Sequence, residues 1–132
     1  MSKLIRQRRY SLIALLLPLL LCACSGPRTV QAGAAELTGG NPDLGEVAIR
    51  TYGCDSCHTI PGIATADSTV GPPLDDWADR HYISGRLANT ADNLILWIRF
   101  PQSVEPGTAM PDLGVSEQEA RNISAYLYTL RR

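Results

Sequence analysis

The feature that most constrains this chain is a pair of cysteines three residues apart, followed at once by a histidine: Cys54-Asp55-Ser56-Cys57-His58. A C-x-x-C pair occurs in thioredoxin-like dithiols, in halves of zinc sites and in c-type haem attachment, and the histidine directly after the pair indicates the last of these. Two thiols on one turn can bond to vinyl groups on adjacent pyrroles of one porphyrin. The following imidazole then lies below the metal, where it can bind iron.

The two other uses of the cysteine pair fit the sequence less well. A structural zinc site takes four ligands, whereas residues 42–132 contain only two cysteines and two histidines, and His81 lacks the usual finger spacing from His58. A thioredoxin-like dithiol is expected in a βαβ context, and no strand pattern precedes Cys54. The pattern therefore favours covalent haem attachment through Cys54 and Cys57, with His58 as an iron ligand.

The first 23 residues have the organisation of a secretory signal peptide. Four of the 12 basic residues of the chain lie among the first ten, and residues 11–21 form an apolar run. A helix that crosses a bilayer needs about 20 apolar residues, so this run is too short for a permanent span. A basic leader, a short apolar run and small residues after it predict an exported protein with a signal peptide over residues 1–23.

The residues around the predicted cleavage site resemble the bacterial lipobox. In Leu21-Cys22-Ala23-Cys24 the second cysteine follows a small residue, so Cys24 is the expected site of lipidation, and Cys22 would leave with the signal peptide. The alternative is ordinary cleavage, for example near Ala34, without lipid. Residues 24–41 are small, polar and rich in glycine and alanine, which predicts a flexible tether ahead of a domain over residues 42–132.

The charge of the chain excludes one class of partner. Without residues 1–23, eight basic residues remain against all 13 acidic ones, a net charge of −5, and none of the eight is a lysine. Nucleic-acid binding relies on clustered lysine and arginine to replace phosphate counterions. We therefore expect no nucleic acid as a partner.

Residues 42–132 show three helical patterns. The first begins at Asn41, a capping residue that is followed by a proline at the first helical position and by Asp43 near the positive end of the helix dipole. One apolar face at helical spacing comprises Leu44, Val47, Ala48 and Tyr52.

The other two patterns follow later in the chain. The second begins near Thr90 and is stopped by Pro101, which cannot continue a helix. The third begins with the capping box Ser116-Glu117-Gln118-Glu119, and its apolar stripe comprises Ala120, Ile123, Tyr126, Leu127 and Leu130. No part of residues 42–132 alternates with period two, so the sequence predicts an all-α fold.

Together these residues resemble a monohaem class I c-type cytochrome, an all-α fold with about three main helices wrapped around one covalent haem. The resemblance covers about residues 42–132. It rests on the order of three motifs: Cys54-x-x-Cys57-His58 after the first helix, Gly71-Pro72-Pro73-Leu74, and Gly107-Thr108-Ala109-Met110-Pro111 before the last helix.

The resemblance implies a role for each matching residue. The carbonyl oxygen of Pro72 would accept a hydrogen bond from Nδ1 of His58 and leave Nε2 for iron. Arg80 lies six residues after Leu74, at the position of a family arginine that contacts a haem propionate. Gly45 matches a glycine at which the terminal helices cross.

The same resemblance makes Met110 the second axial ligand. It is the only methionine beyond residue 1, and it lies in a Pro/Gly loop rather than on the apolar helix face where methionine usually fills space. His81 is the alternative ligand. Trp77, Tyr82 and Trp97 are large enough to wall the haem or bind its propionates, and simple core packing is an equal alternative for each.

These expectations define a function. Iron with both axial positions filled by protein has no vacant site for a substrate, so one-electron transfer rather than catalysis is expected. The sequence thus predicts an electron carrier of a bacterial respiratory chain, on the periplasmic side of the envelope and lipid-anchored to the membrane. Its partners would be a dehydrogenase or a membrane oxidase. The alternatives are a haem-bearing subunit of such a complex, and a haem enzyme or gas sensor if the sixth ligand is labile.

Overall fold

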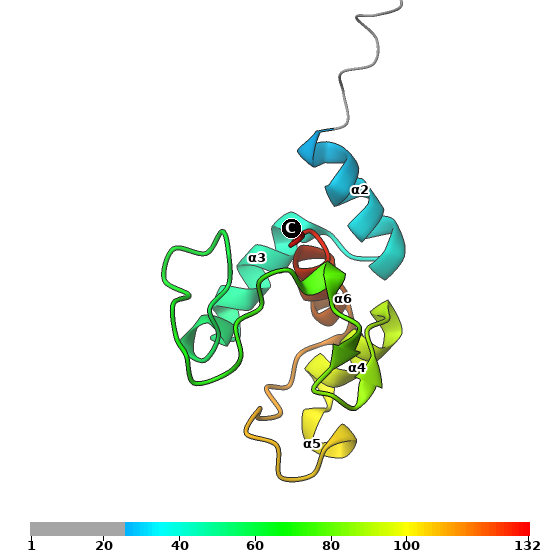
Figure 1. Cartoon of the computed structure of the whole chain (residues 1–132). Helices are drawn as coiled ribbons and strands as arrows, with labels where there is room; N and C mark the ends of the chain where they lie inside the picture. The colour runs from blue at the N-terminus through cyan, green and yellow to red at the C-terminus, as the bar shows by residue number, and fades with distance from the viewer. Residues whose placement is uncertain (1–25) are drawn as a thin grey trace, which may run out of the picture.

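The structure, a computed structural model, describes residues 26–132; the predicted signal peptide and Cys24 lie outside the described residues. The described chain contains helices α2 (Pro27–Thr38), α3 (Pro42–Thr51), α4 (Ala91–Arg99), α5 (Pro101–Val104) and α6 (Glu117–Leu127), and short 3-10 turns η2 (Cys54–Ser56) and η3 (Trp77–Asp79) (Figure 1). The all-α prediction is confirmed, and α3, α4 and α6 are the three predicted main helices. A small antiparallel hairpin pairs β1 (Tyr82–Ile83) with β2 (Leu87–Ala88).

The starts of the three main helices are capped as the sequence predicts. The side chain of Asn41 accepts hydrogen bonds from the backbone N–H groups of Asp43 and Leu44 at the start of α3. Thr90 caps α4 and Ser116 caps α6 in the same way. Each cap satisfies backbone donors that have no partner within the helix. α6 ends at Leu127, so Leu130, which the sequence places on its stripe, lies beyond the helix.

Helices α3 and α6 cross in direct backbone contact. A Cβ atom on Gly45 would overlap the carbonyl group of Asn122 and would lie 2.9 Å from Cβ of Tyr126. Only glycine permits this approach of the two backbones. Next to it, Ile49 is 1% exposed and Ile123 is 3% exposed, and both belong to the main core. Gly45 therefore lies where the family resemblance placed it.

The buried face of α3 differs from the predicted one. The sequence placed Leu44 and Val47 on one apolar face with Ala48, yet Leu44 is 55% exposed and Val47 is 60% exposed. The buried residues are instead Gly45, Ala48 and Ile49, with Pro42 at the start. The close approach at Gly45 fixes which side of α3 meets α6, and apolar periodicity alone cannot locate such a contact.

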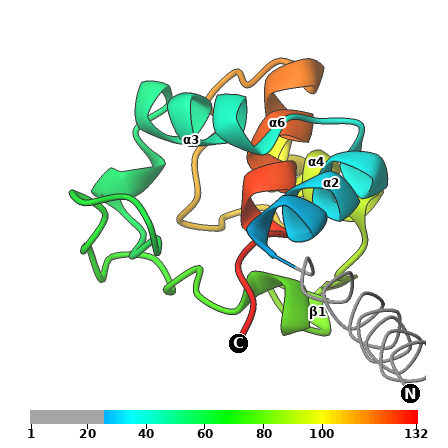
Figure 2. The same ribbon diagram turned by 90° about the horizontal axis from the view of Figure 1, so that it is seen from above.

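The predicted flexible tether over residues 24–41 is wrong for its larger part, since residues 27–38 form α2. Three alanines favour the helix, and Gly39 ends it in the left-handed conformation at φ 67°. Ala34 and Thr38 are buried, and Arg121 of α6 donates a hydrogen bond to the carbonyl oxygen of Thr38 at 3.0 Å. α2 therefore packs against α6 as part of the domain (Figure 2).

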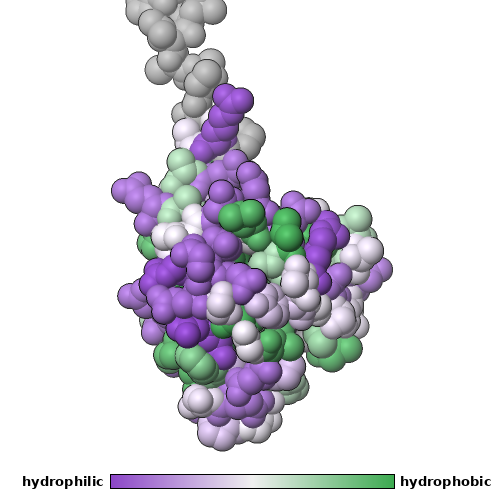
Figure 3. Space-filling model, turned by 180° about the vertical axis from the view of Figure 1, so that it is seen from behind, coloured by the Kyte–Doolittle hydropathy of each residue, from purple (hydrophilic) through white to green (hydrophobic). Residues whose placement is uncertain are grey.

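The remaining surface is mixed in polarity. Figure 3 shows apolar patches separated by polar residues on the face behind that of Figure 1. Within residues 26–132 no helix combines the length and the apolar character needed to span a bilayer. Two long segments contain no α-helix. One runs from α3 to η3 and includes η2, and the other runs from α5 to α6. Both carry residues of the candidate site.

Candidate functional site

The Cys54–His58 segment follows α3 through a sharp turn. Gly53 adopts φ 67°, and η2 then brings the backbone N–H groups of Cys57 and His58 to the carbonyl oxygen of Cys54, at 3.2 and 3.0 Å. Both cysteines are free thiols, partly buried. Burial raises the pKa of Cys54 to about 11, so its thiol remains protonated at neutral pH.

The second motif, Gly71–Leu74, lies against the first. The N–H of Gly71 donates to the carbonyl oxygen of Cys57 at 2.7 Å, and the N–H of Leu74 donates to that of Thr59 at 2.8 Å. Between these two bonds, Nδ1 of His58 lies 2.7 Å from the carbonyl oxygen of Pro72. The structure thus brings together two motifs that are more than ten residues apart in the sequence, as the family resemblance implied.

This contact determines which nitrogen of His58 carries the proton. A carbonyl oxygen can only accept a hydrogen bond, so Nδ1 must be the donor. In a neutral imidazole Nε2 then keeps its lone pair and can bind a metal ion. The geometry accordingly prepares Nε2 of His58 as a metal ligand.

Gly71 leaves room for the imidazole. A Cβ atom at this position would lie 2.5 Å from Cε1 of His58 and 2.8 Å from Nδ1, closer than non-bonded atoms come. Any larger residue must therefore push the ring away from its contact with Pro72. The sequence pattern alone gave no steric reason for a glycine here.

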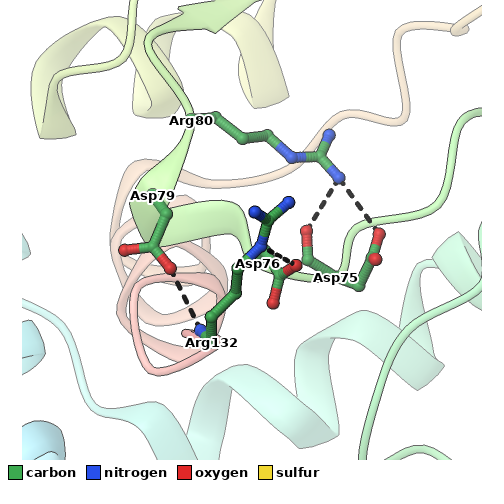
Figure 4. Close-up of a pocket in the computed structure, with 5 residues that line it drawn as sticks. All are labelled: Asp75, Asp76, Asp79, Arg80 and Arg132. Atoms are coloured by element: carbon green, nitrogen blue, oxygen red, sulfur yellow. Dashed lines mark hydrogen bonds and ion pairs between the residues drawn. The ribbon is translucent and has the colours of Figure 1, made fainter.

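Arg80 lines a small polar pocket formed by residues that follow the Gly71–Leu74 segment and by the end of the chain. Its guanidinium donates to the carbonyl oxygen of Pro73 at 2.5 Å. It also donates to the carbonyl oxygen of Asp75 at 2.8 Å and to the carboxylate of Asp75 at 3.3 Å (Figure 4). Asp76, Asp79 and Arg132 complete the pocket. The backbone N–H of Arg132 donates to the carboxylate of Asp79, and its Nε donates to that of Asp76. Arg80 is therefore held beside the Gly71–Leu74 segment, with its side chain 29% exposed.

Two of the three aromatic residues considered for a cofactor wall are buried. Trp77 is 6% exposed and Trp97 is 9% exposed, whereas Tyr82 is 65% exposed on the hairpin. The indole Nε1 of Trp77 is buried without a hydrogen-bond partner among the described residues, and the guanidinium of Arg80 stacks on its ring at 5.1 Å. A buried N–H without a partner is costly, so a hydrogen-bond acceptor placed beside Nε1 of Trp77 would stabilise the folded state.

Met110 lies in the loop between α5 and α6, partly buried against the core. The amide of Gln102 on α5 donates to the carbonyl oxygens of Thr108 and Met110 at 2.7 and 2.8 Å. His81, the alternative ligand, is exposed just before β1. The loop that carries Met110 is therefore fastened to a helix by a side chain.

Sequence reasoning missed two polar residues that hold the site together. Asn89 donates to the carbonyl oxygens of Trp77 and Arg80 and accepts from the hydroxyl of Tyr128, so it joins η3 to the end of α6. Gln102 in the same way joins α5 to the loop that carries Met110. Neither residue lies in a motif, and only the folded chain shows what they bind.

The donors fit the group that the resemblance implies. Among residues 26–132 no three side chains of histidine, cysteine, aspartate or glutamate are grouped to share a metal ion. The available donors are two free thiols, an imidazole nitrogen with a free lone pair and a thioether, the set that holds haem c. The unpartnered Nε1 of Trp77 supplies a donor suited to a carboxylate.

The chain is similar to known proteins over most of its length. A family model described as "Cytochrome c" matches residues 40–131. Cytochrome c oxidase subunit 2 of Alkalihalophilus pseudofirmus is 35% identical over 103 residues, covering 77% of this chain and 29% of that protein. Cytochrome c oxidase subunit 2 of Bacillus sp. strain PS3 is 32% identical over 88 residues, covering 64% of this chain and 25% of that protein. The chain thus spans less than a third of either relative, and no solved structure matches it.

Proposed function

Because the chain belongs to the cytochrome c family, we propose that it is a one-electron carrier with a single covalent haem c, ligated by His58 and Met110. The observation that carries the proposal is the contact between Nδ1 of His58 and the carbonyl oxygen of Pro72. It orients the imidazole and leaves Nε2 available in a chain that holds two free thiols next to it. When bound, haem supplies reversible one-electron chemistry at iron.

Each site residue has a defined task in this proposal. Cys54 and Cys57 form the two thioether links, and both are free thiols that such a reaction requires. His58 and Met110 would be the two protein ligands of the iron, a pair that favours a higher potential than two histidines. With both positions filled by protein, the site excludes substrates from the iron.

Arg80 and Trp77 are suited to the propionates. The Nε1 of Trp77 is a buried donor that has no partner among residues 26–132, and Arg80 stacks on the same ring. A propionate carboxylate would satisfy the indole N–H and add a charge-assisted hydrogen bond to Arg80. Asp75, which now pairs with Arg80, would compete with the propionate for this guanidinium.

A terminal oxidase is the electron acceptor that the relatives favour. Both are cytochrome c oxidase subunit 2. This chain covers less than a third of their length, so the match concerns only a part of each relative. We propose that the chain delivers electrons to such an oxidase as a carrier. A second candidate is a dedicated haem-bearing subunit of one oxidase, which the same relatives favour because the match lies within an oxidase polypeptide.

The charge of the chain bears on how it would dock. Residues 24–132 carry a net charge of −5 and no lysine, and two propionates make the surface more acidic. A basic or an apolar partner surface is expected from charge complementarity. Raising the salt concentration should slow electron transfer to a basic partner, and a rate independent of salt would eliminate that form of docking.

We further place the protein on the periplasmic side of the membrane, exported by its signal peptide and lipidated at Cys24. The motif at residues 21–24 supports this proposal. Only two residues separate Cys24 from Pro27, the first residue of α2, and α2 packs on α6. A lipid on Cys24 would therefore hold the domain close to the bilayer, and metabolic labelling of the wild type and of Cys24→Ala tests the assignment.

Spectroscopy of the purified protein tests the proposed function. A carrier should be red, should give a low-spin ferrous spectrum that carbon monoxide leaves unchanged, and should be oxidised by membranes that contain the terminal oxidase. Rapid binding of carbon monoxide by the wild type would instead support a sensor or an enzyme with an open iron position. Oxidation that requires co-purification in one stable complex would favour the dedicated subunit.

A further inference from the structure

We propose that Gln102 is a positioning residue that holds Met110 within reach of the iron. The inference rests on the proposed function, because it assumes that Met110 is the axial ligand. Gln102 itself touches no ligand atom of that site. It acts through the backbone of the loop that carries the methionine.

The side-chain amide of Gln102 makes three contacts to one short loop. Nε2 donates to the carbonyl oxygens of Thr108 and Met110, at 2.7 and 2.8 Å, and Oε1 accepts from the N–H of Gly107 at 3.2 Å. A flipped amide would face two carbonyl oxygens with its own oxygen, so only this orientation satisfies all three partners. One side chain thus spans the loop from Gly107 to Met110.

The loop has little else to fix it. In the described part of the chain, no other group donates a hydrogen bond to the carbonyl oxygens of residues 107–110. The loop begins at Gly107, with φ 86°, and only the N–H of Thr108, which donates to the carbonyl oxygen of Glu105, adds a further backbone bond there. Loss of the Gln102 amide would therefore release the segment that presents Met110.

The support behind Gln102 is rigid. It lies on α5, whose first residue, Pro101, is buried, and α5 follows α4 with only Phe100 between them. α4 in turn buries Leu94, Trp97 and Ile98 in the core. The position of the Met110 backbone is therefore tied through Gln102 to the packed interior rather than to a mobile surface segment.

Three variants of the haem-loaded protein test this role. Gln102→Leu keeps the size of the side chain and removes all three hydrogen bonds, whereas Gln102→Glu keeps the acceptor for Gly107 and loses the donor. Ser103→Ala changes an exposed neighbour on the same helix and serves as the control. The readouts are the sulfur-to-iron charge-transfer absorption, the affinity of the ferric protein for added imidazole, and the thermal unfolding midpoint.

Gln102→Leu should bind imidazole at least about tenfold more tightly than the wild type, since loss of the three hydrogen bonds weakens the hold on the methionine by roughly that factor or more. Gln102→Glu should show much of the same gain in imidazole affinity, and Ser103→Ala should show none.

One outcome would overturn the inference alone: the wild type shows the sulfur absorption and Met110→Ala loses it, but Gln102→Leu binds imidazole like the wild type. In that case the inference is wrong and the proposed function stands. If the wild type lacks the sulfur absorption, the proposed ligation fails, and the inference fails with it. A lower unfolding midpoint of Gln102→Leu with unchanged imidazole affinity would reduce Gln102 to a structural role and overturn the proposal.

Discussion

Nδ1 of His58 lies 2.7 Å from the carbonyl oxygen of Pro72, between two backbone hydrogen bonds that join the same two segments. The imidazole is thus held by one hydrogen bond to a backbone carbonyl, and among residues 26–132 no side chain contacts Nδ1 through a hydrogen bond. A ring fixed in this way presents Nε2 in one direction, which is what a permanent metal ligand requires.

Substitution of Gly71 should disturb this arrangement directly. In Gly71→Ala the new Cβ would lie 2.5 Å from Cε1 of His58, so the ring or the loop must shift, at a cost of about 1–3 kcal/mol. We expect a lower yield of haem-loaded protein and a lower unfolding midpoint. Val70→Ala is the control, because Val70 is 78% exposed and should be neutral. Equal haem loading and equal stability of the two variants would show that the ring does not need this space.

Removal of the proposed sulfur ligand should open the iron. Met110→Ala should lose the sulfur-to-iron charge-transfer absorption and acquire carbon monoxide binding in the ferrous state, since no other thioether exists beyond residue 1. His81→Ala is the matched control and should keep both properties of the wild type. The opposite result, with His81→Ala opening the iron and Met110→Ala leaving it closed, would assign the ligand to His81.

Substitution by alanine should have opposite effects at two helical glycines, Gly45 in the contact between α3 and α6 and Gly33 on the open side of α2. Gly45→Ala should destabilise the protein by about 1–3 kcal/mol or more, because its Cβ would overlap the backbone of Asn122. Gly33→Ala lies within α2 with no atom within 4 Å of the new Cβ, so it should stabilise the protein by up to about 1 kcal/mol. Urea unfolding of the haem-loaded variants measures both. No gain for Gly33→Ala would argue against α2 as a folded part of the domain.

The start of α6 predicts a dependence of stability on pH. Hydrogen bonds from the hydroxyls of Ser116 and Tyr52 lower the pKa of Glu119 below its ordinary value of 4.5. A carboxylate whose pKa is lower in the folded than in the unfolded protein stabilises the folded state. This contribution is complete at pH values above the pKa in the unfolded protein, and it is lost as the pH falls through the pKa in the folded protein. The wild type should therefore be more stable than Glu119→Gln at neutral pH, and the difference should shrink below about pH 4.5.

The control for this experiment is Glu36→Gln, an exposed carboxylate on α2. The difference in stability between the wild type and the Glu36→Gln variant should change little over the same pH range. A difference between the wild type and Glu119→Gln that stays constant from neutral to acidic pH would contradict the proposed role of the Glu119 carboxylate.

The motifs and the helix starts could be predicted from the sequence because local chemistry determines them. Asn41, Thr90 and Ser116 cap helices through contacts within three residues, and such contacts are encoded locally. The pairing of His58 with Pro72 could be expected only through the family resemblance, since the two residues are distant in sequence.

The parts that could not be predicted depend on tertiary contacts. Residues 27–38 have a composition typical of a tether, but burial of Ala34 and Thr38 against the domain stabilises them as α2. Leu44 and Val47 have helical spacing, but Gly45 determines the buried side of α3. Gln102 and Asn89 have no local signature, because their partners lie on other segments.

Intact-mass spectrometry of the purified, denatured protein tests the central claim most directly. The account predicts the mass of the processed polypeptide plus the lipid on Cys24 and one haem, with the haem retained after acid–acetone extraction and lost from a Cys54→Ala, Cys57→Ala double variant. A bare polypeptide mass, or pigment that separates freely from the wild type on extraction, would contradict a haem bound through Cys54 and Cys57.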